Sequence, residues 1–147
     1  MTTTELILSA QALSSAAMCG LIWFVQMVHY PLFARTDTTH AADYPEENQR
    51  RTGPVVIPPM LVEAATAAAI AVSPPPEIGR PAALVGLAMV AALWLSTLLV
   101  QMPLHARLSR DGHSPATVAA LVRSNWFRTA LWSARALLAI WMLHAAG

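Results

Sequence analysis

Side chains that could bind a ligand or move a proton recur at helical spacing within strongly apolar parts of the sequence. They form four sets, which are Trp23, Gln26, His29 and Tyr30; Glu63; Trp94, Gln101 and His105; and Asn125, Arg128, Trp132 and Arg135. At about 100° per residue, each set of several residues falls on one side of a helix. Polar groups at membrane depth usually face a bundle interior or a hydrated cavity. We therefore expect the four sets to converge on one polar site.

The two histidines raise the question of a metal or haem site. His29 and His105 lie at corresponding ends of two apolar segments. With Glu63 they could form a two-histidine, one-carboxylate metal site, and two facing imidazoles could instead ligate haem. Neither segment has the short His-x-x-His or Glu-x-x-His spacing that makes a metal signal strong. The cofactor is therefore unknown, and the sequence requires neither a metal ion nor haem.

Glu63 and Arg135 are the only charged residues well inside the apolar segments. An unpaired charge there costs about 2.5–3.5 kcal/mol on insertion scales. We therefore expect an ion pair between the second and fourth helices. The pair could simply hold the helices together, or it could form part of a site for an anionic or metal-bound ligand.

The other candidates have structural interpretations beside the functional ones. Gln26 and Gln101 could form hydrogen bonds between helices without touching a ligand. The tryptophans could be packing residues. The Arg128 side chain could extend to the lipid headgroups.

The composition places these residues in a membrane. The chain has 147 residues, of which 56% are hydrophobic and 12% charged, and its mean hydropathy is +0.49. All nine basic residues are arginines, and the net charge is only +1. This balance excludes a disordered chain and a nucleic-acid-binding protein, and it fits a soluble enzyme poorly. We expect an integral membrane protein in contact with the lipid bilayer.

Four apolar segments predict an all-α, four-transmembrane-helix bundle that forms a single domain. The expected helices cover about residues 6–30, 55–73, 82–102 and 115–145. Pro31 should end the first helix and the prolines at 54–59 should mark the start of the second, because proline does not suit a regular helix interior. Ser114 and Pro115 should begin the fourth helix as its N-cap and first helical residue.

The polar connections predict the orientation. The first connection, residues 31–54, is long enough for a short surface helix that starts near Pro45 and ends near Arg51. Seven arginines lie on the side of the first and third connections, against Arg80 alone on the other side: Arg35, Arg50, Arg51, Arg107, Arg110, Arg123 and Arg128. Cytoplasmic loops carry the excess of arginine and lysine. We therefore expect the protein to lie in the inner membrane with both termini outside the cytoplasm. The polar site should lie in the cytoplasmic half of the helix bundle.

The two halves of the chain share short motifs. VQM occurs at residues 25–27 and 100–102, PLxAR at 31–35 and 103–107, and NxxRT at 48–52 and 125–129. The three matches come in the same order and at corresponding helix ends. They indicate a duplicated helical hairpin, with chance similarity in a chain rich in alanine, leucine and arginine as the alternative.

The same segments carry a family resemblance. Residues 23–33 read WFVQMVHYPLF, residues 58–63 PPMLVE, residues 96–105 STLLVQMPLH and residues 125–135 NWFRTALWSAR. Together they resemble a family of bacterial four-helix membrane proteins without an assigned reaction. The closing NxxRT helix is also similar, more loosely, to the anthrone oxygenase-like membrane proteins. That resemblance implies an enzyme that oxidises polycyclic phenols with oxygen.

These observations lead to two functional hypotheses. In the first, the protein is an oxidoreductase or oxygenase that takes an apolar aromatic substrate from the bilayer. Trp23, Trp94, Trp132 and Tyr30 would contact the substrate, and His29 and His105 would move protons. Arg128 and Arg135 would hold a phenolate oxygen of the substrate. Gln26, Gln101 and Asn125 would orient the substrate. In the second, the same site binds or transports a small molecule without chemistry, or the chain is a subunit of a membrane complex. A homo-oligomer is compatible with both.

Overall fold

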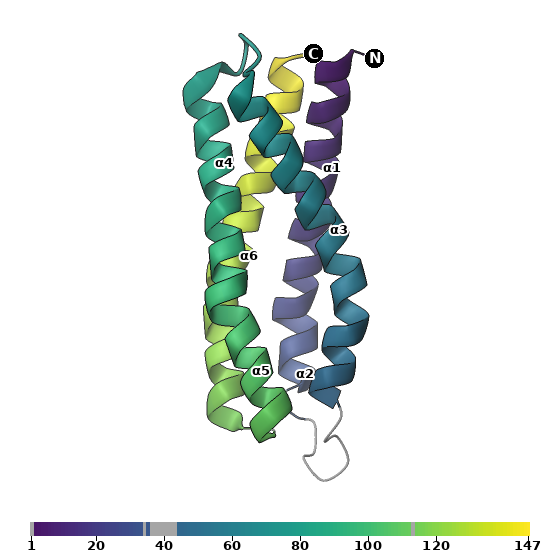
Figure 1. Cartoon of the computed structure of the whole chain (residues 1–147), viewed down its shortest axis with the longest axis vertical. Coiled ribbons are helices and arrows are strands. Elements are labelled where there is room, and N and C mark those ends of the chain that lie inside the picture. Colours follow the sequence, from purple (N-terminus) through teal and green to yellow (C-terminus); the bar gives the residue numbers. More distant parts are fainter. Residues whose placement is uncertain (1, 34, 36–43, 113) are drawn as a thin grey trace.

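The computed structural model describes residues 2–33, 35, 44–112 and 114–147, and this part of the chain forms a bundle of four helical rods (Figure 1). The rods are built, in order, from α1 (Thr3–Phe24), η1 (Val25–His29) and α2 (Tyr30–Phe33); α3 (Tyr44–Val72); α4 (Gly79–Ser96), η2 (Thr97–Gln101) and α5 (Met102–Asp111); and α6 (Pro115–Ala145). Both termini lie at one end of the bundle, and α2 and α5 lie at the other. The expected all-α bundle is confirmed.

Three of the rods are long and apolar enough to cross a membrane. These are Thr3–Leu32, Glu46–Val72 and Gly79–Asp111. The fourth rod, α6, packs against α1 and α4, and two of its arginines, Arg128 and Arg135, are buried. Leucines such as Leu13, Leu99 and Leu137 point outward. An apolar outer surface around a partly polar interior is the arrangement expected for a bundle in lipid.

Pro31 does not end the first helix, contrary to the sequence-based expectation. The helix continues to Phe33 through a π-helical turn, in which the Tyr30 N–H bonds to the Val25 carbonyl. A second π-helical turn precedes Pro103, and in it the Met102 N–H donates to the Thr97 carbonyl. A proline lacks an N–H and its ring crowds the carbonyl four residues earlier, so a wider turn lets the helix pass. The matching turns agree with the proposed duplication.

The expected surface helix before the second span is also wrong. Tyr44–Val72 is one continuous helix that contains Pro54, Pro58 and Pro59. Arg50 and Arg51 do not end a separate helix. They lie in the first turns of α3, where both form ion pairs with Glu47. Prolines are tolerated in membrane helices where neighbouring helices and local adjustment compensate for the lost hydrogen bonds.

The α6 helix begins as the sequence predicts. The Ser114 hydroxyl accepts a hydrogen bond from the Thr117 N–H at 3.4 Å, and Pro115 is the first helical residue. The second copy of the NxxRT motif lies in this helix with Asn125, Arg128 and Thr129 all buried. In the first copy Arg51 is exposed, so the repeated motif occupies different environments in the two halves.

The bundle interior contains three apolar clusters. The first, around Leu8, Ile70 and Met142, involves the helix ends near the termini. The middle cluster consists of Met18, Ile22, Met60, Leu93 and Trp132. The third consists of Tyr30, Leu108, Val118 and Leu121, near the opposite end. The buried polar side chains lie between and beside these clusters.

Candidate functional site

One group of polar side chains centres on Tyr30, in the half of the bundle away from the termini. The Tyr30 hydroxyl lies 3.5 Å from Gln101 Oε1 and 3.5 Å from His105 Nε2. Gln101 Nε2 in turn donates to the Ser124 hydroxyl at 3.0 Å. Residues from α2, η2 and α5 therefore meet at one hydroxyl, and Gln101 connects them to α6 through Ser124. Tyr30 and Gln101 are both buried, each beside the π-turn of its rod.

A second set of contacts joins the first helix to α6 in the same half. Asn125 Nδ2 donates to Gln26 Oε1 at 2.8 Å, and Arg128 Nη1 donates to Asn125 Oδ1 at 3.1 Å. Gln26 Nε2 also donates to the Val122 carbonyl. Arg128 thereby places a positive charge in the same half of the bundle as Tyr30. We call these seven residues the Tyr30 cluster: Gln26, Tyr30, Gln101, His105, Ser124, Asn125 and Arg128.

Arg128 is a buried residue rather than a headgroup anchor. Only 7% of its surface is exposed, and its guanidinium carbon lies 5.0 Å from the centroid of the Trp132 ring. The two residues are four apart on α6, which places them one above the other on one helix face. A cation over an aromatic face is attracted by the ring quadrupole. The alternative that Arg128 extends to the headgroups is therefore wrong.

Trp132 also contacts a second polar group through its edge. Its Nε1 donates to Glu63 Oε2 at 3.0 Å, and the Ser15 hydroxyl donates to Glu63 Oε1 at 2.7 Å. Arg135 Nε lies 3.6 Å from Glu63 Oε1, with the two side chains 0% and 2% exposed. The predicted ion pair between the second and fourth helices is thus present. We call Ser15, Glu63, Trp132 and Arg135 the Glu63 cluster.

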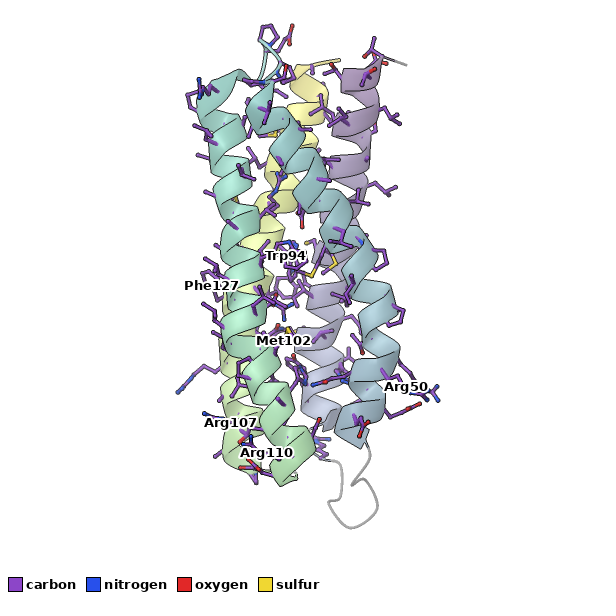
Figure 2. The ribbon with its side chains drawn as sticks, viewed as in Figure 1. Arg50, Trp94, Met102, Arg107, Arg110 and Phe127 are labelled. Atoms are coloured by element: carbon purple, nitrogen blue, oxygen red, sulfur yellow. The ribbon has the colours of Figure 1, made fainter. Side chains whose placement is uncertain are left out.

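The structure divides the expected single site into two clusters. Trp132 is the link between them, and it belongs to the middle apolar cluster of the bundle. Trp94 packs against that cluster, and Figure 2 shows it nearer the middle of the bundle than Met102. Glu63 and Arg135 therefore lie close to mid-depth and not with the Tyr30 cluster in the arginine-rich half.

Two other predicted site residues lie outside the two polar clusters, one on the surface of the bundle and one beside Tyr30. Trp23 is 42% exposed, its Nε1 donates to the Ser133 hydroxyl at 2.9 Å, and its ring meets Trp126 edge-on. It therefore sits on the outer seam between α1 and α6. The His29 ring is half-buried and lies 5.8 Å, centroid to centroid, from the Tyr30 ring. It borders the Tyr30 cluster.

The expected three-ligand metal site does not form. Among the residues that the structure describes, no three His, Cys, Asp or Glu side chains are grouped so that they could hold a metal ion. His105 is engaged with Tyr30, whereas Glu63 is engaged with Ser15 and Trp132 in the other cluster. His29, His105 and Glu63 are therefore not brought together.

Several buried polar residues were missed by the sequence analysis. Gln11 and Ser15 are buried in α1, and Ser124 and Thr129 are part of the α6 contacts. A signal existed for the first two, because residues 11, 15, 18, 22, 26 and 30 follow one helix face at steps of three and four. Serine and threonine were harder to identify, since they bond readily to their own helix carbonyls.

No family model, curated protein or solved structure matches the chain.

Proposed function

We propose that this protein is embedded in the cytoplasmic membrane and binds an apolar aromatic molecule with a hydroxyl group at the Tyr30 cluster. The observation that carries the proposal is the Tyr30 hydroxyl, which is buried and has two partners, each at 3.5 Å. Normal hydrogen bonds between oxygens are about 2.7–2.8 Å long. Because both contacts are long, the buried hydroxyl can still form a shorter hydrogen bond with an oxygen atom of a ligand.

The chemistry around this hydroxyl suits a phenol. The Tyr30 hydroxyl has one proton and can donate it to only one of Gln101 and His105. In the tautomer in which His105 Nε2 is an acceptor, one of the two acceptors is left for a ligand hydroxyl. Arg128 supplies positive charge beside the same group, which would favour a phenolate oxygen. Leu108, Val118 and Leu121 supply an apolar environment for an aromatic body.

The catalytic form of this proposal is an oxidation. His105 would accept the phenolic proton, Arg128 would stabilise the phenolate, and Gln26 with Asn125 would keep the arginine in place. Dioxygen would be the oxidant, as the loose resemblance to anthrone oxygenase-like proteins implies. One of its oxygen atoms would replace the hydrogen on the ring carbon opposite the hydroxyl, and the other would leave as water with that hydrogen and the hydroxyl proton, so that the product is a quinone. His29, at the edge of the cluster, would pass the proton onward.

Binding or transport without chemistry is the second candidate. It is favoured by the hydrogen bonds among Gln26, Asn125 and Arg128, which hold these side chains in place although the Arg128 Nε keeps no partner. A rigid, largely satisfied set of polar groups recognises a ligand without changing it. A role as a subunit of a larger membrane complex would use the same contacts.

The orientation is part of the proposal. Arg50, Arg107 and Arg110 lie at the end of the bundle away from both termini (Figure 2). The positive-inside rule then puts the Tyr30 cluster in the cytoplasmic half and both termini on the opposite side.

The test compares two aromatic probes that differ only by the hydroxyl. Binding of 1-naphthol and of naphthalene to detergent-purified protein would be followed by quenching of tryptophan fluorescence. We expect naphthol to bind the wild type about tenfold more tightly, which corresponds to one hydrogen bond of about 1.4 kcal/mol.

Two variants test whether the preference for naphthol over naphthalene arises at Tyr30. Tyr30→Phe should remove the difference between the probes, while His144→Ala, at an exposed histidine near the C-terminus, should keep it. Equal affinity of both probes for the wild type would overturn the proposal. Product formed from naphthol only in the presence of oxygen would select the catalytic form.

A further inference from the structure

The Arg135 side chain is fully buried and incompletely paired. It is 0% exposed, and none of its three guanidinium nitrogens has a hydrogen-bond partner among the described residues. A guanidinium carries five N–H donors and remains charged in proteins. Leaving such a group without acceptors is among the more costly arrangements in a protein interior.

Glu63 does not fill this need. Its Oε1 accepts the Ser15 hydroxyl and its Oε2 accepts the Trp132 N–H, at 2.7 and 3.0 Å. The shortest distance to Arg135 is 3.6 Å, which is an ion pair but not a hydrogen bond. The carboxylate is therefore held by its other two partners and leaves the guanidinium donors available.

The charges of the interior do not balance. Of the charged side chains that the structure describes, those of Glu63, Arg128 and Arg135 are buried, which leaves one positive charge in excess. Neither arginine can lose its proton to relieve this charge. The excess charge is that of Arg128 in the Tyr30 cluster, whereas Arg135 is balanced in charge by Glu63 but lacks acceptors for its N–H groups.

On the side of α4, the missing side chain of Gly86 leaves a gap beside Arg135 of about one methyl group, so a carboxylate would enter only if a neighbouring side chain moved. The residue opposite is Gly86, where an added Cβ would stand 3.4 Å from Arg135 Nη1 and 3.5 Å from Met142 Cε. Met142 is a flexible side chain that can shift. Gln11 also has a buried atom without a hydrogen-bond partner, its Oε1. The Nε2 of the same amide contacts Met142 Sδ at 3.4 Å. Unpaired polar atoms from α1 and α6 thus flank one methionine.

We propose that Arg135 is the anchor of an anion site between α1, α4 and α6, and that it takes a carboxylate. The planar guanidinium matches a carboxylate with two parallel hydrogen bonds. Rotation of the Gln11 amide would turn its N–H₂ group from the sulfur to the anion. The site is distinct from the Tyr30 cluster, because Trp132 and the middle apolar cluster lie between them.

The carboxylate could come from a free small anion or from the head of an apolar acid in the bilayer. Formate probes the first source and hexanoate the second, with hexanol as the uncharged match for hexanoate. Protein purified in detergent and a zwitterionic buffer, without added salt, would be unfolded thermally with each probe. Titration of ¹³C-formate by NMR would measure binding directly.

The wild type should be stabilised by formate, by hexanoate or by both, and not by hexanol. At a concentration 100 times Kd, the folding equilibrium constant should rise about 100-fold. Stabilisation by formate alone indicates an enclosed site for a free anion, and stabilisation by hexanoate alone indicates a site open to lipid. A wild type that responds to neither anion, with no formate binding by NMR, would overturn the proposal.

Two variants test the role of Arg135. Arg135→Met should abolish the response, while Arg123→Met, at an exposed arginine of the same helix, should keep it. Glu63→Gln removes the competing carboxylate and should tighten formate binding by about tenfold or more. An anion response that persists in Arg135→Met, or a weaker response in Glu63→Gln, would contradict the site. Loss of this response would leave the naphthol binding at Tyr30 unaffected, so the two proposals can fail separately.

Discussion

Replacement of Glu63 by glutamine tests how the buried charges support each other. In the wild type the carboxylate accepts hydrogen bonds from Ser15 and Trp132 and pairs with Arg135 at 3.6 Å. A glutamine is nearly the same size, but one of its two terminal atoms becomes an N–H₂ donor. That donor would face either the Ser15 hydroxyl or the Trp132 N–H, and Arg135 would lose its counter-charge.

The magnitude follows from what each substitution leaves behind. Glu63→Gln leaves a buried guanidinium with no hydrogen bond and no carboxylate, and removal of one partner of a buried pair costs about 3–5 kcal/mol. Arg135→Met leaves a carboxylate that keeps both hydrogen bonds, so its cost should be smaller, about 1–3 kcal/mol. The expected order, with Glu63→Gln the more damaging, is specific to this arrangement.

The assay is equilibrium unfolding in mixed detergent and SDS, followed by near-UV circular dichroism in the same zwitterionic buffer. The double variant Glu63→Gln/Arg135→Met should lose at least about 1 kcal/mol less than the sum of the single losses. Glu77→Gln and Arg123→Met, both at exposed positions, provide the matched control pair. Single losses that add to within about 0.5 kcal/mol, or a larger loss for Arg135→Met, would refute the reasoning.

Three further predictions concern other parts of the bundle. Trp132→Phe keeps an aromatic ring in the core but removes the N–H bonded to Glu63, so it should cost about 1.5–3 kcal/mol in the same unfolding assay. Gly20→Ala, where an added Cβ meets nothing within 4 Å, should stabilise the protein by about 1 kcal/mol, whereas Gly86→Ala should fail to do so because its Cβ meets a guanidinium nitrogen at 3.4 Å. A reporter that is active only in the cytoplasm should be silent when it is fused after Gly147, and a strong signal would reverse the topology.

The helical rods could largely be predicted from the sequence, but their ends could not. Long apolar segments predict spanning helices because lipid offers no partners for an open backbone. The same lack of hydrogen-bond partners in lipid favours helices that continue past a proline. The first helix accommodates Pro31 through a π-turn, and Pro58 lies within α3. A general rule about proline in water overestimates its power to end a helix here.

The pairing of Glu63 with Arg135 was predictable, because two isolated charges in apolar segments have few other means of compensation. The division into two clusters was not. Angular spacing ignores position along a helix, and Arg135 lies seven residues beyond Arg128 on α6, about 10 Å further along its axis. The outer position of Trp23 was not predictable either, because spacing of 100° per residue does not continue through the π-turns at Val25–His29 and Thr97–Gln101. Trp23 and Gln26 lie on opposite sides of the start of such a turn, and Trp23 faces outward while Gln26 faces inward.

The loose contacts of Tyr30 and the orphan donors of Arg135 could not be read from residue types at all. They depend on distances of a few tenths of an ångström, which arise when four helices pack together. Gln101 bonds to Ser124 rather than closely to Tyr30, and Glu63 bonds to Ser15 rather than to the arginine. The sequence identifies which polar groups are inside, and the packing decides which of them are left to bind something else.

The central claim is that the interior of this membrane bundle binds a small hydroxylated aromatic molecule at Tyr30. Native mass spectrometry of the protein released from lipid nanodiscs, after incubation with naphthol, tests it most directly. The account predicts one naphthol retained per chain in the wild type and in His144→Ala, and none in Tyr30→Phe. A wild type that carries no naphthol under these conditions, or a Tyr30→Phe variant that carries as much as the wild type, would contradict it.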